Sequence, residues 1–296
     1  MSGRRLGEAV RDGAQRLEDA QVAFGHGTSD AAQEALWLAC GVLGMTWQET
    51  CDSLDMPLAA ERDKALADLV TRRIATRKPA AYLLHEAWLG KHRFYVDERV
   101  IVPRSFIFEL MPTGDRPLVP PFGTSGLSPV SVLDLCTGSG CLAILAALAF
   151  PQASVDAADL SAAALEVAKR NVADYQLGGR IRLVESDLFA GLKGRKYDLI
   201  ISNPPYVKAS AMRKLPEEYR REPAMALASG VDGLEHVRVI LAQAHRHLNP
   251  GGLLVVEIGR NRKALEKAYP GLPFEWPRTS GGAGFVFTLP REALQA

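Results

Sequence analysis

The chain has 296 residues, enough for one large domain or for a large domain with a smaller one. Apolar residues make up 47% and charged residues 23%, which is ordinary for a soluble globular protein. The 35 basic and 34 acidic residues leave a net charge of +1, which excludes a general polyanion binder and argues against stable nucleic-acid binding, without excluding a local basic face.

The first 90 residues are predicted to form a small helical domain. Residues 1–16 carry arginines among acidic residues and lack the apolar segment of a signal peptide. From residue 10 to residue 89, apolar side chains recur at helical spacing with charges between them. One such series is Ala35, Leu36, Leu38, Ala39, Val42 and Leu43.

A β-hairpin linker is predicted over residues 91–107, with a larger domain following over residues 108–296. Two short strands would flank the polar turn at Asp97-Glu98. The apolar positions of these strands are Phe94, Val96, Val100 and Val102. Residues 112–129 then contain five prolines and three glycines without periodicity, which predicts a loop.

From residue 131 onward, predicted strands and helices alternate. This rhythm is typical of a parallel sheet with helices on both faces, and therefore predicts a Rossmann-like α/β class. The predicted strands are 132–135, 154–159, 181–184, 197–202, 253–258, 274–276 and 285–289, with the last two forming a closing hairpin around Gly281-Gly282. The predicted helices follow Gly140 and span 161–175 and about 232–248.

Membrane insertion and metal binding are not expected. The longest apolar run, Cys141 to Phe150, is roughly half of what a bilayer crossing requires. The four cysteines form no C-x-x-C pair and have no accompanying histidine spacing of a zinc site. Free thiols in a reducing cytoplasm are the simplest interpretation.

The first candidate site is a glycine turn after a predicted strand, Asp134-Leu135-Cys136-Thr137-Gly138-Ser139-Gly140. Its glycines allow a ligand to approach backbone amides at the start of a helix. The pattern from Gly138 to Ala143 also fits G-x-G-x-x-A, so the turn could equally hold the pyrophosphate of a dinucleotide. A tight turn without a ligand is the structural alternative.

Acidic residues end the next two strands. Asp159 can accept hydrogen bonds from the vicinal hydroxyls of a ribose, although it could instead cap the following helix, a role that Ser161 could also fill. Asp187 could receive an adenine amino group, and Leu188 or Phe189 could cover the ring face. These later positions could equally be ordinary turn and core residues.

The second candidate site is Asn203-Pro204-Pro205-Tyr206, which follows the buried run Leu199 to Ile201. Consecutive prolines fix the backbone and leave carbonyl oxygens free to accept. The side-chain oxygen of Asn203 and the carbonyl of Pro204 could hold the two hydrogens of an amide, with Tyr206 packing on its plane. Residues 203–206 are therefore interpreted as an amide clamp, with a rigid exposed turn as the alternative.

The combination of this glycine turn with Asn-Pro-Pro-Tyr after the fourth strand resembles the glutamine and amino-methyltransferase branch of the seven-strand methyltransferases. Val102-Pro103-Arg104-Ser105 and Asp232-Gly233-Leu234 narrow the resemblance to bacterial protein-glutamine methyltransferases, over roughly residues 83–289. The chain departs from that pattern at Phe106, where a second proline is expected, and at residues 112–129, where relatives have helix.

Cys136 to Gly140 and Glu218 to Pro223 are more similar to the enzymes that methylate large-subunit ribosomal protein number three than to those that methylate release factors. The resemblance implies that the chain uses S-adenosylmethionine to methylate a glutamine amide in a protein, with the helical domain recognising that substrate. The implied cofactor residues are Asp134, Cys136, Thr137, Gly138, Ser139, Gly140, Asp159, Asp187, Leu188 and Asn203. Catalysis is expected from Asn203, Pro204 and Tyr206, and substrate binding from these together with Pro205.

Other functions remain open from the residues alone. A release-factor glutamine methyltransferase would use the same clamp, and a DNA adenine amino-methyltransferase poses the same geometric problem for a flipped base. A nicotinamide-dependent oxidoreductase would explain Gly138, Gly140 and Asp159 but not the clamp. A noncatalytic protein that binds a cofactor or associates with the ribosome is a further alternative. Residues 212–223, rich in arginine and glutamate, could be a docking surface or a solvated loop.

Overall fold

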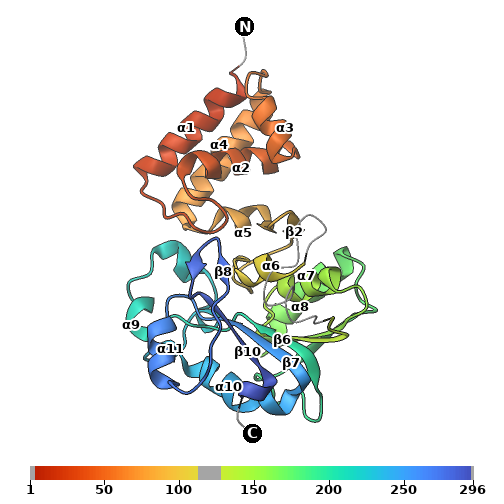
Figure 1. Cartoon of the computed structure of the whole chain (residues 1–296). Helices are drawn as coiled ribbons and strands as arrows, with labels where there is room; N and C mark the ends of the chain where they lie inside the picture. The colour runs from red at the N-terminus through yellow and green to blue at the C-terminus, as the bar shows by residue number, and fades with distance from the viewer. Residues whose placement is uncertain (1–3, 113–127, 295–296) are drawn as a thin grey trace.

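The computed structural model describes residues 4–112 and 128–294. Helices of the N-terminal third lie at one end of the molecule, and a twisted sheet flanked by helices occupies the other (Figure 1). The predicted domain boundaries at residues 90 and 107 stay predictions. In the structure, the last helix of the helical part ends at Leu84, and the first strand of the central sheet begins at Ser131.

The helical prediction for the N-terminal part is confirmed. Its helices are α1 (Leu6–Asp19), α2 (Ala31–Leu43), α3 (Trp47–Asp52), α4 (Ala60–Thr76) and α5 (Ala80–Leu84). The Asp30 side chain accepts a hydrogen bond from the Gln33 amide at 2.8 Å and begins α2. A capping box of Thr46 and Glu49 begins α3. Apolar side chains from α1, α2 and α4 then pack into one core.

The linker contains a hairpin, but its predicted position was wrong. Strands β1 (Ala87–Leu89) and β2 (His92–Phe94) pair antiparallel around Gly90, whose φ of +61° suits glycine. No strand flanks Asp97-Glu98. Instead the Asp97 carboxylate accepts a hydrogen bond from the Arg99 amide at 3.0 Å and makes a local turn. The neighbouring valines, Val96, Val100 and Val102, are buried in the core of the helical part without pairing as strands.

A short helix, α6 (Ile107–Leu110), follows the linker. The loop predicted for residues 112–129 lies almost entirely outside the described residues, because only 112, 128 and 129 of that stretch are described.

The central sheet contains six strands within the described residues, in the order β10-β7-β6-β3-β4-β5. Five of these strands run parallel to one another, in the order β7, β6, β3, β4 and β5. The sixth, β10, is antiparallel to β7. Their bounds are β3 (Ser131–Leu135), β4 (Ser154–Asp159), β5 (Ile181–Glu185), β6 (Tyr197–Ser202), β7 (Leu248–Glu257) and β10 (Val286–Pro290). The Rossmann-like α/β prediction is confirmed.

The sixth predicted strand, residues 274–276, does not form a ladder. Glu275 and Thr288 make a single antiparallel bridge next to β10. Pro273 and Pro277 flank the segment and have no N–H to donate, so the pairing cannot extend. The closing hairpin around Gly281-Gly282 is reduced to β8 (Arg278–Thr279) and β9 (Gly282–Ala283).

The alternating side chains of the strands bury both faces of the sheet. One face, with Val132, Val155 and Leu199, packs against α7 (Cys141–Ala149) and part of α8 (Ala162–Asp174). The other face, with Leu133, Ile200 and Leu254, packs against α10 (Glu235–His247) and α11 (Arg262–Ala268). Helices cover both faces, as predicted. The remaining short helices are α9 (Ala209–Met212), η1 (Glu217–Arg221), η2 (Ala224–Ala226) and η3 (Arg291–Ala293).

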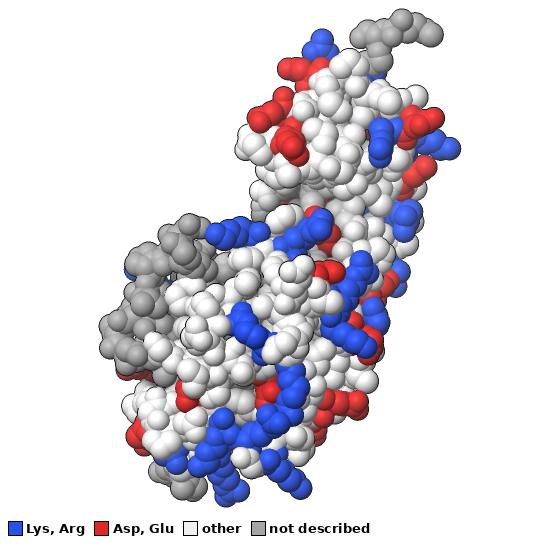
Figure 2. All heavy atoms as spheres, turned by 90° about the vertical axis from the view of Figure 1, so that its right-hand side faces the viewer, with Lys and Arg blue, Asp and Glu red and all other residues white. Residues whose placement is uncertain are grey.

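Charge is unevenly distributed over the surface. Figure 2 shows Lys and Arg side chains gathered on one face of the sheet-containing part, with fewer Asp and Glu side chains among them. The net charge of +1 therefore hides a local excess of positive charge on this face. Among the described residues, no helix is both long enough and apolar enough to cross a membrane.

Candidate active site

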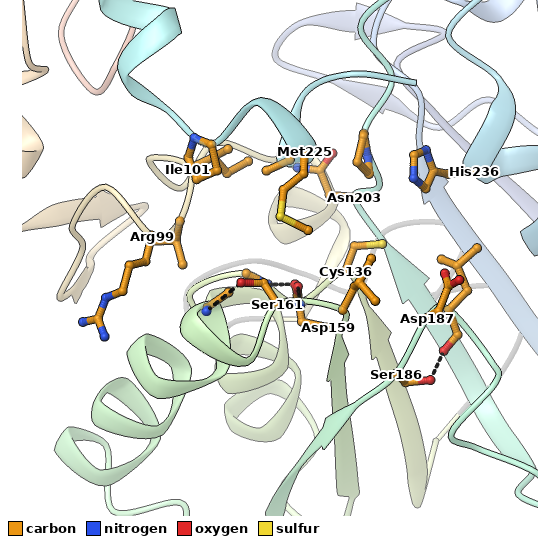
Figure 3. Close-up of a pocket in the computed structure, with 18 residues that line it drawn as sticks. Arg99, Ile101, Cys136, Asp159, Ser161, Ser186, Asp187, Asn203, Met225 and His236 are labelled. Carbon is orange, nitrogen blue, oxygen red and sulfur yellow. Dashed lines mark hydrogen bonds between the residues drawn. The ribbon is translucent and has the colours of Figure 1, made fainter. Parts of the chain in front are cut away.

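Two adjacent cavities lie beside the carboxyl ends of the parallel strands. The strand-end cavity, about 720 Å³ including the space at its mouth, is lined by the ends of β3, β4 and β5 (Figure 3). The clamp cavity, about 510 Å³ on the same measure, is lined by Arg104, Pro204, Tyr206 and Tyr219, among others. Ile101, Asn203 and Ala226 line both cavities, so Asn203 stands at their junction.

The glycine turn after β3 forms one wall of the strand-end cavity. Cys136 and Gly138 line it, with φ values of +60° and +55°. The Gly138 amide donates to the Asp159 carboxylate at 2.8 Å. Gly140, with φ of +80°, begins α7, and a Cβ atom there would lie 3.1 Å from the Cβ of Ala168 on α8. Only glycine lets α7 and α8 approach this closely while the turn stays open.

Four predicted cofactor residues do not line the cavity: Asp134, Thr137, Ser139 and Gly140. Asp134 is fully buried beneath the turn, where its carboxylate accepts hydrogen bonds from the Thr137 hydroxyl at 2.5 Å and the Ala143 amide at 3.0 Å. Burial raises the pKa of Asp134 to about 7. Asp134 therefore holds the shape of the turn, and a direct contact between these four residues and a cofactor stays a prediction.

Asp159 is placed to bind a diol. Its carboxylate oxygens accept from the Gly138 amide at 2.8 Å and the Ser161 amide at 2.9 Å, and each retains further acceptor capacity. The Ser161 hydroxyl caps α8 by accepting from the Ala164 amide, so Asp159 is not needed for that role. Burial raises the pKa of Asp159.

The turn after β5 forms the opposite wall. Asp187 and Leu188 line the strand-end cavity, together with Ser186. The Ser186 hydroxyl donates to the Leu188 carbonyl at 2.6 Å and accepts from the Gly191 amide at 2.9 Å, which fixes Leu188 at a φ of +47°. Phe189, the other residue considered for the ring face, is buried in the core and does not line the cavity.

Several cavity residues were not predicted. They come from the linker, from α8, from the η2 region and from α10, and include Arg99, Ile101, Ser161, Met225 and His236 (Figure 3). Burial lowers the pKa of His236, which favours its neutral form. Met225 stands outside every predicted strand and helix, and this isolated apolar residue was the available sequence signal. In the structure it lies in η2 and is 52% exposed.

The clamp residues follow β6 and separate the two cavities. Pro205 faces the strand-end cavity, and Pro204 and Tyr206 face the clamp cavity. The Asn203 side-chain oxygen is buried and has no hydrogen-bond partner in the part of the chain that the structure describes. A buried acceptor without a partner costs free energy unless a ligand satisfies it. The predicted amide-binding atom is therefore available.

Glycines hold Tyr206 in place. A Cβ atom on Gly259 would lie 2.7 Å from the Tyr206 ring, and one on Gly233 would lie 2.5 Å from the Tyr206 carbonyl oxygen. That carbonyl also accepts from the Asn261 side-chain amide at 2.8 Å. Burial and the nearby Glu257 carboxyl raise the pKa of the Tyr206 hydroxyl. The Asp232-Gly233-Leu234 motif thus supports the clamp through the contact of Gly233 with the Tyr206 backbone.

The two other motifs behind the family resemblance meet beside the clamp. The Arg104 guanidinium binds both oxygens of Glu222, at 2.7 Å and 2.5 Å, and Glu222 also accepts from the Val102 amide. Burial alone would raise the pKa of Glu222, but Arg104 and His26 lower it to about 2. Residues 102–105 and 218–223 therefore form a single wall of the clamp cavity.

This geometry suits group transfer between two ligands that meet at Asn203. A nucleoside fits the strand-end cavity, where Asp159 offers acceptors for ribose hydroxyls and Leu188 offers an apolar contact. A planar amide fits the clamp cavity, where Asn203 supplies a free acceptor.

Known proteins share both parts of the chain. Residues 8–84 match the family model of the PrmC N-terminal domain, and residues 114–230 match that of the methyltransferase small domain. The ribosomal protein uL3 glutamine methyltransferase of Neisseria meningitidis serogroup B (strain ATCC BAA-335 / MC58) is 52% identical over 97% of this chain and 93% of its own length. The protein of the same name from Burkholderia pseudomallei (strain K96243) is 50% identical over 98% of this chain and 95% of its own.

A solved structure supports the fold. The catalytic domain of hMettl16, in complex with MAT2A 3′UTR hairpin 6, aligns with a TM-score of 0.51 and 14% identity, covering 78% of this chain and 81% of that domain. At this identity the likeness shows a shared fold and nothing about ligands.

Proposed function

The chain belongs to the family of ribosomal protein uL3 glutamine methyltransferases, and from this we propose that it methylates the side-chain amide nitrogen of a glutamine in ribosomal protein uL3. The observation that carries the proposal is that Asn203 lines both the strand-end cavity and the clamp cavity, while its buried side-chain oxygen has no hydrogen-bond partner among the described residues. Such a junction is needed where a methyl group passes from one ligand to the other.

The residues of the strand-end cavity fit S-adenosylmethionine. Asp159 would accept from the ribose hydroxyls, Asp187 and Leu188 would contact the adenine, and Cys136 and Gly138 would border the remaining part of the cofactor. When bound, S-adenosylmethionine supplies an electrophilic methyl group on a sulfonium. The open space beside Gly138, where an added Cβ would meet no atom within 4 Å, leaves room for close approach.

The clamp would position the glutamine. Asn203 and the Pro204 carbonyl would accept the two amide hydrogens, and Tyr206 would pack on the amide plane, with Pro205 keeping the backbone rigid. An amide nitrogen is a poor nucleophile because its lone pair is delocalised, so alignment carries most of the rate. Such alignment can contribute about 7–11 kcal/mol.

The reaction needs no general base before transfer. The bond between sulfur and the methyl carbon breaks as the bond between nitrogen and that carbon forms, and the nitrogen becomes transiently positive. Hydrogen bonds to Asn203 and Pro204 strengthen as this charge develops. The methylated amide is then strongly acidic and loses one proton to water.

A protein substrate follows from the family, and we propose the cytoplasm as the place of reaction because ribosomal proteins are made there. The expectation of no stable nucleic-acid binding stays a prediction, and the basic face in Figure 2 is the surface to examine for it.

A release factor is the alternative protein substrate, because it would offer the same amide to the clamp. DNA adenine methylation is the more distant alternative.

The test incubates the pure protein with methyl-labelled S-adenosylmethionine and, separately, unmethylated uL3, a release factor and DNA. Mass spectrometry then locates the label. Label on one glutamine of uL3 supports the proposal. Label on the release factor alone would retain the chemistry and change the substrate, and label only on DNA would overturn the substrate class.

A further inference from the structure

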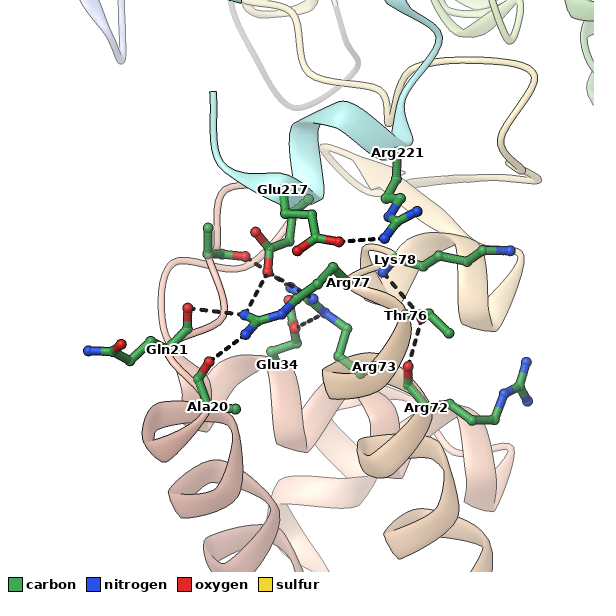
Figure 4. Close-up of polar contacts among 12 residues, drawn as sticks. Ala20, Gln21, Glu34, Arg72, Arg73, Thr76, Arg77, Lys78, Glu217 and Arg221 are labelled. Atoms are coloured by element: carbon green, nitrogen blue, oxygen red, sulfur yellow. Dashed lines mark hydrogen bonds and ion pairs between the residues drawn. The ribbon is translucent and has the colours of Figure 1, made fainter. Parts of the chain in front are cut away.

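Residues 217–222, here called the wall turn, connect the helical part of the molecule to the clamp cavity. Tyr219 lines that cavity, and Glu218 and Glu222 of the same turn are buried. Figure 4 shows Glu217 and Arg221 of this turn lying against the end of α4, near Arg73 and Arg77. The turn is therefore a shared element of the helical part and the active site.

Glu218 is held by two arginines of the helical part. Its carboxylate lies 3.4 Å from Arg73 Nη1 and 3.3 Å from Arg77 Nη1, and its side chain is only 3% exposed. Arg73 is fully buried and also binds Glu34 of α2 at 2.7 Å. The two positive charges of this cluster, on Arg73 and Arg77, therefore balance its two negative charges, on Glu34 and Glu218. Because an unpaired buried charge is costly, the wall turn has a strong preference for this docked position.

Tyr219 is enclosed by the loop between α1 and α2. Its ring centroid lies 4.2 Å from that of the buried His26. A Cβ atom on Gly25, which has a φ of +117°, would lie 2.5 Å from the Tyr219 hydroxyl. On the other side, the Arg104 guanidinium lies 5.4 Å from the Tyr219 ring centroid. The loop before α2 therefore sets the position of a residue in the clamp cavity.

The same contacts continue to the clamp. His26 Nε2 lies 3.5 Å from a carboxylate oxygen of Glu222, and Glu222 binds Arg104 through both oxygens. The backbone carbonyl of Arg104 accepts a hydrogen bond from the Asn203 side chain. Movement of the wall turn would therefore change the position of the Asn203 side chain, which binds the amide.

We propose that the helical domain positions the amide clamp through the wall turn, with His26 and Arg77 as positioning residues for glutamine methylation. The proposal rests on the proposed function and adds a second role for the helical domain beyond recognition of the substrate. Its physical basis is that a misplacement of about 1 Å at a reacting centre can cost about 10²-fold in rate. Arg77 is 25% exposed, so its replacement is better tolerated than that of the fully buried Arg73.

The experiment compares full-length Arg77→Gln and His26→Gln with the control Arg221→Gln. Arg221 belongs to the same turn but, among the described residues, forms an ion pair with Glu217 of that turn alone, so its loss leaves the docking contacts intact. We expect kcat/KM for uL3 to fall about tenfold in the first two variants and to stay within about twofold in the control. The Kd for S-adenosylmethionine, measured by calorimetry, should stay within about twofold in all three.

A second measurement does not depend on activity. Hydrogen exchange of the backbone amides of residues 217–222 should be faster in Arg77→Gln than in the wild type, and unchanged in Arg221→Gln. Wild-type exchange and kcat/KM in folded Arg77→Gln and His26→Gln would overturn the inference. So would loss of cofactor binding in proportion to activity, because that pattern indicates general destabilisation. If the wild type failed to methylate uL3, the proposed function would fail, whereas the exchange result would still test the positioning.

Discussion

The side-chain nitrogen of Asn203 donates a hydrogen bond to the backbone carbonyl oxygen of Arg104, 3.4 Å away. This contact orients the Asn203 amide so that its oxygen, which has no partner among the described residues, is left for a ligand. The clamp residue is therefore held by the segment that enters the catalytic domain. This orientation supports the proposed role of Asn203 in binding an amide.

Replacing Asn203 with alanine should lower kcat by about 10² or more, because one acceptor for the developing charge is lost. The fold should persist, since within the described part of the chain the side chain makes a single long hydrogen bond. Steady-state kinetics with uL3 would measure the effect. Asn249→Ala, which removes an asparagine bound to Asp198 away from the cavities, is the control and should keep normal turnover. Near-normal activity of Asn203→Ala would eliminate the clamp.

Asp159→Asn should weaken S-adenosylmethionine binding by about tenfold or more, because hydrogen bonds to a charged acceptor contribute about 1.5–3 kcal/mol. Calorimetric titration would give the Kd. The control is Glu185→Gln, since Glu185 pairs with Asp159 in the register of β4 and β5 but is exposed and lies off the cavity wall. Equal affinities for wild type and Asp159→Asn would remove Asp159 from the cofactor site.

Gly259→Ala should displace the Tyr206 ring, because the added Cβ would lie 2.7 Å from it, and kcat should fall by about tenfold or more. Both this residue and Gly251 have positive φ, so the control Gly251→Ala carries a similar backbone cost of roughly 1–2 kcal/mol. No atom would lie within 4 Å of the new Cβ at Gly251. Stability should therefore fall in both variants, but activity only in Gly259→Ala. Matching kinetic losses in the two would contradict this.

Glu257 should make stability depend on pH. Burial raises the pKa of this carboxyl from 4.5 to about 7, although its carboxylate accepts from Ser105 and the Phe106 amide. The folded state then binds the proton more tightly than the unfolded state, so the contribution of Glu257 to the free energy of unfolding is highest below about pH 4.5. It declines as pH rises to about 7 and is constant above.

Urea denaturation at pH 5 and pH 8 would test this expectation. The wild type should lose more stability between the two pH values than Glu257→Gln, which has no titrating group at this position. Other titrating groups are common to both proteins and cancel in the difference. An identical loss in the two proteins would show that Glu257 titrates near its ordinary pKa.

Much of the fold could be predicted because its signals are local. Helical spacing before residue 84, the alternation of strands and helices after residue 131, the glycine turn at Gly138 and the motif of residues 203–206 are each visible in short stretches of sequence. Parallel strands end at one edge of their sheet, so residues following β3, β4, β5 and β6 had to lie near one another. The two candidate sites therefore came from sequence alone.

Other features depended on contacts between distant residues. The hairpin formed around Gly90 because the valines predicted as its strands were drawn into the core of the helical part. The 274–276 strand failed because prolines flank it. Asp134 turned out to support the glycine turn from beneath rather than to face the cavity.

The sequence by itself determined the class of fold and indicated the two candidate sites, since these follow from periodicity and from short motifs. Only the tertiary structure decided that Glu222 binds Arg104 across 118 positions and that Glu218 binds Arg73 across 145. A charged residue in a sequence gives no sign of its partner, because the free energy of an ion pair depends on burial and distance. Packing of the helical part against the wall turn provides both the burial and the short distance.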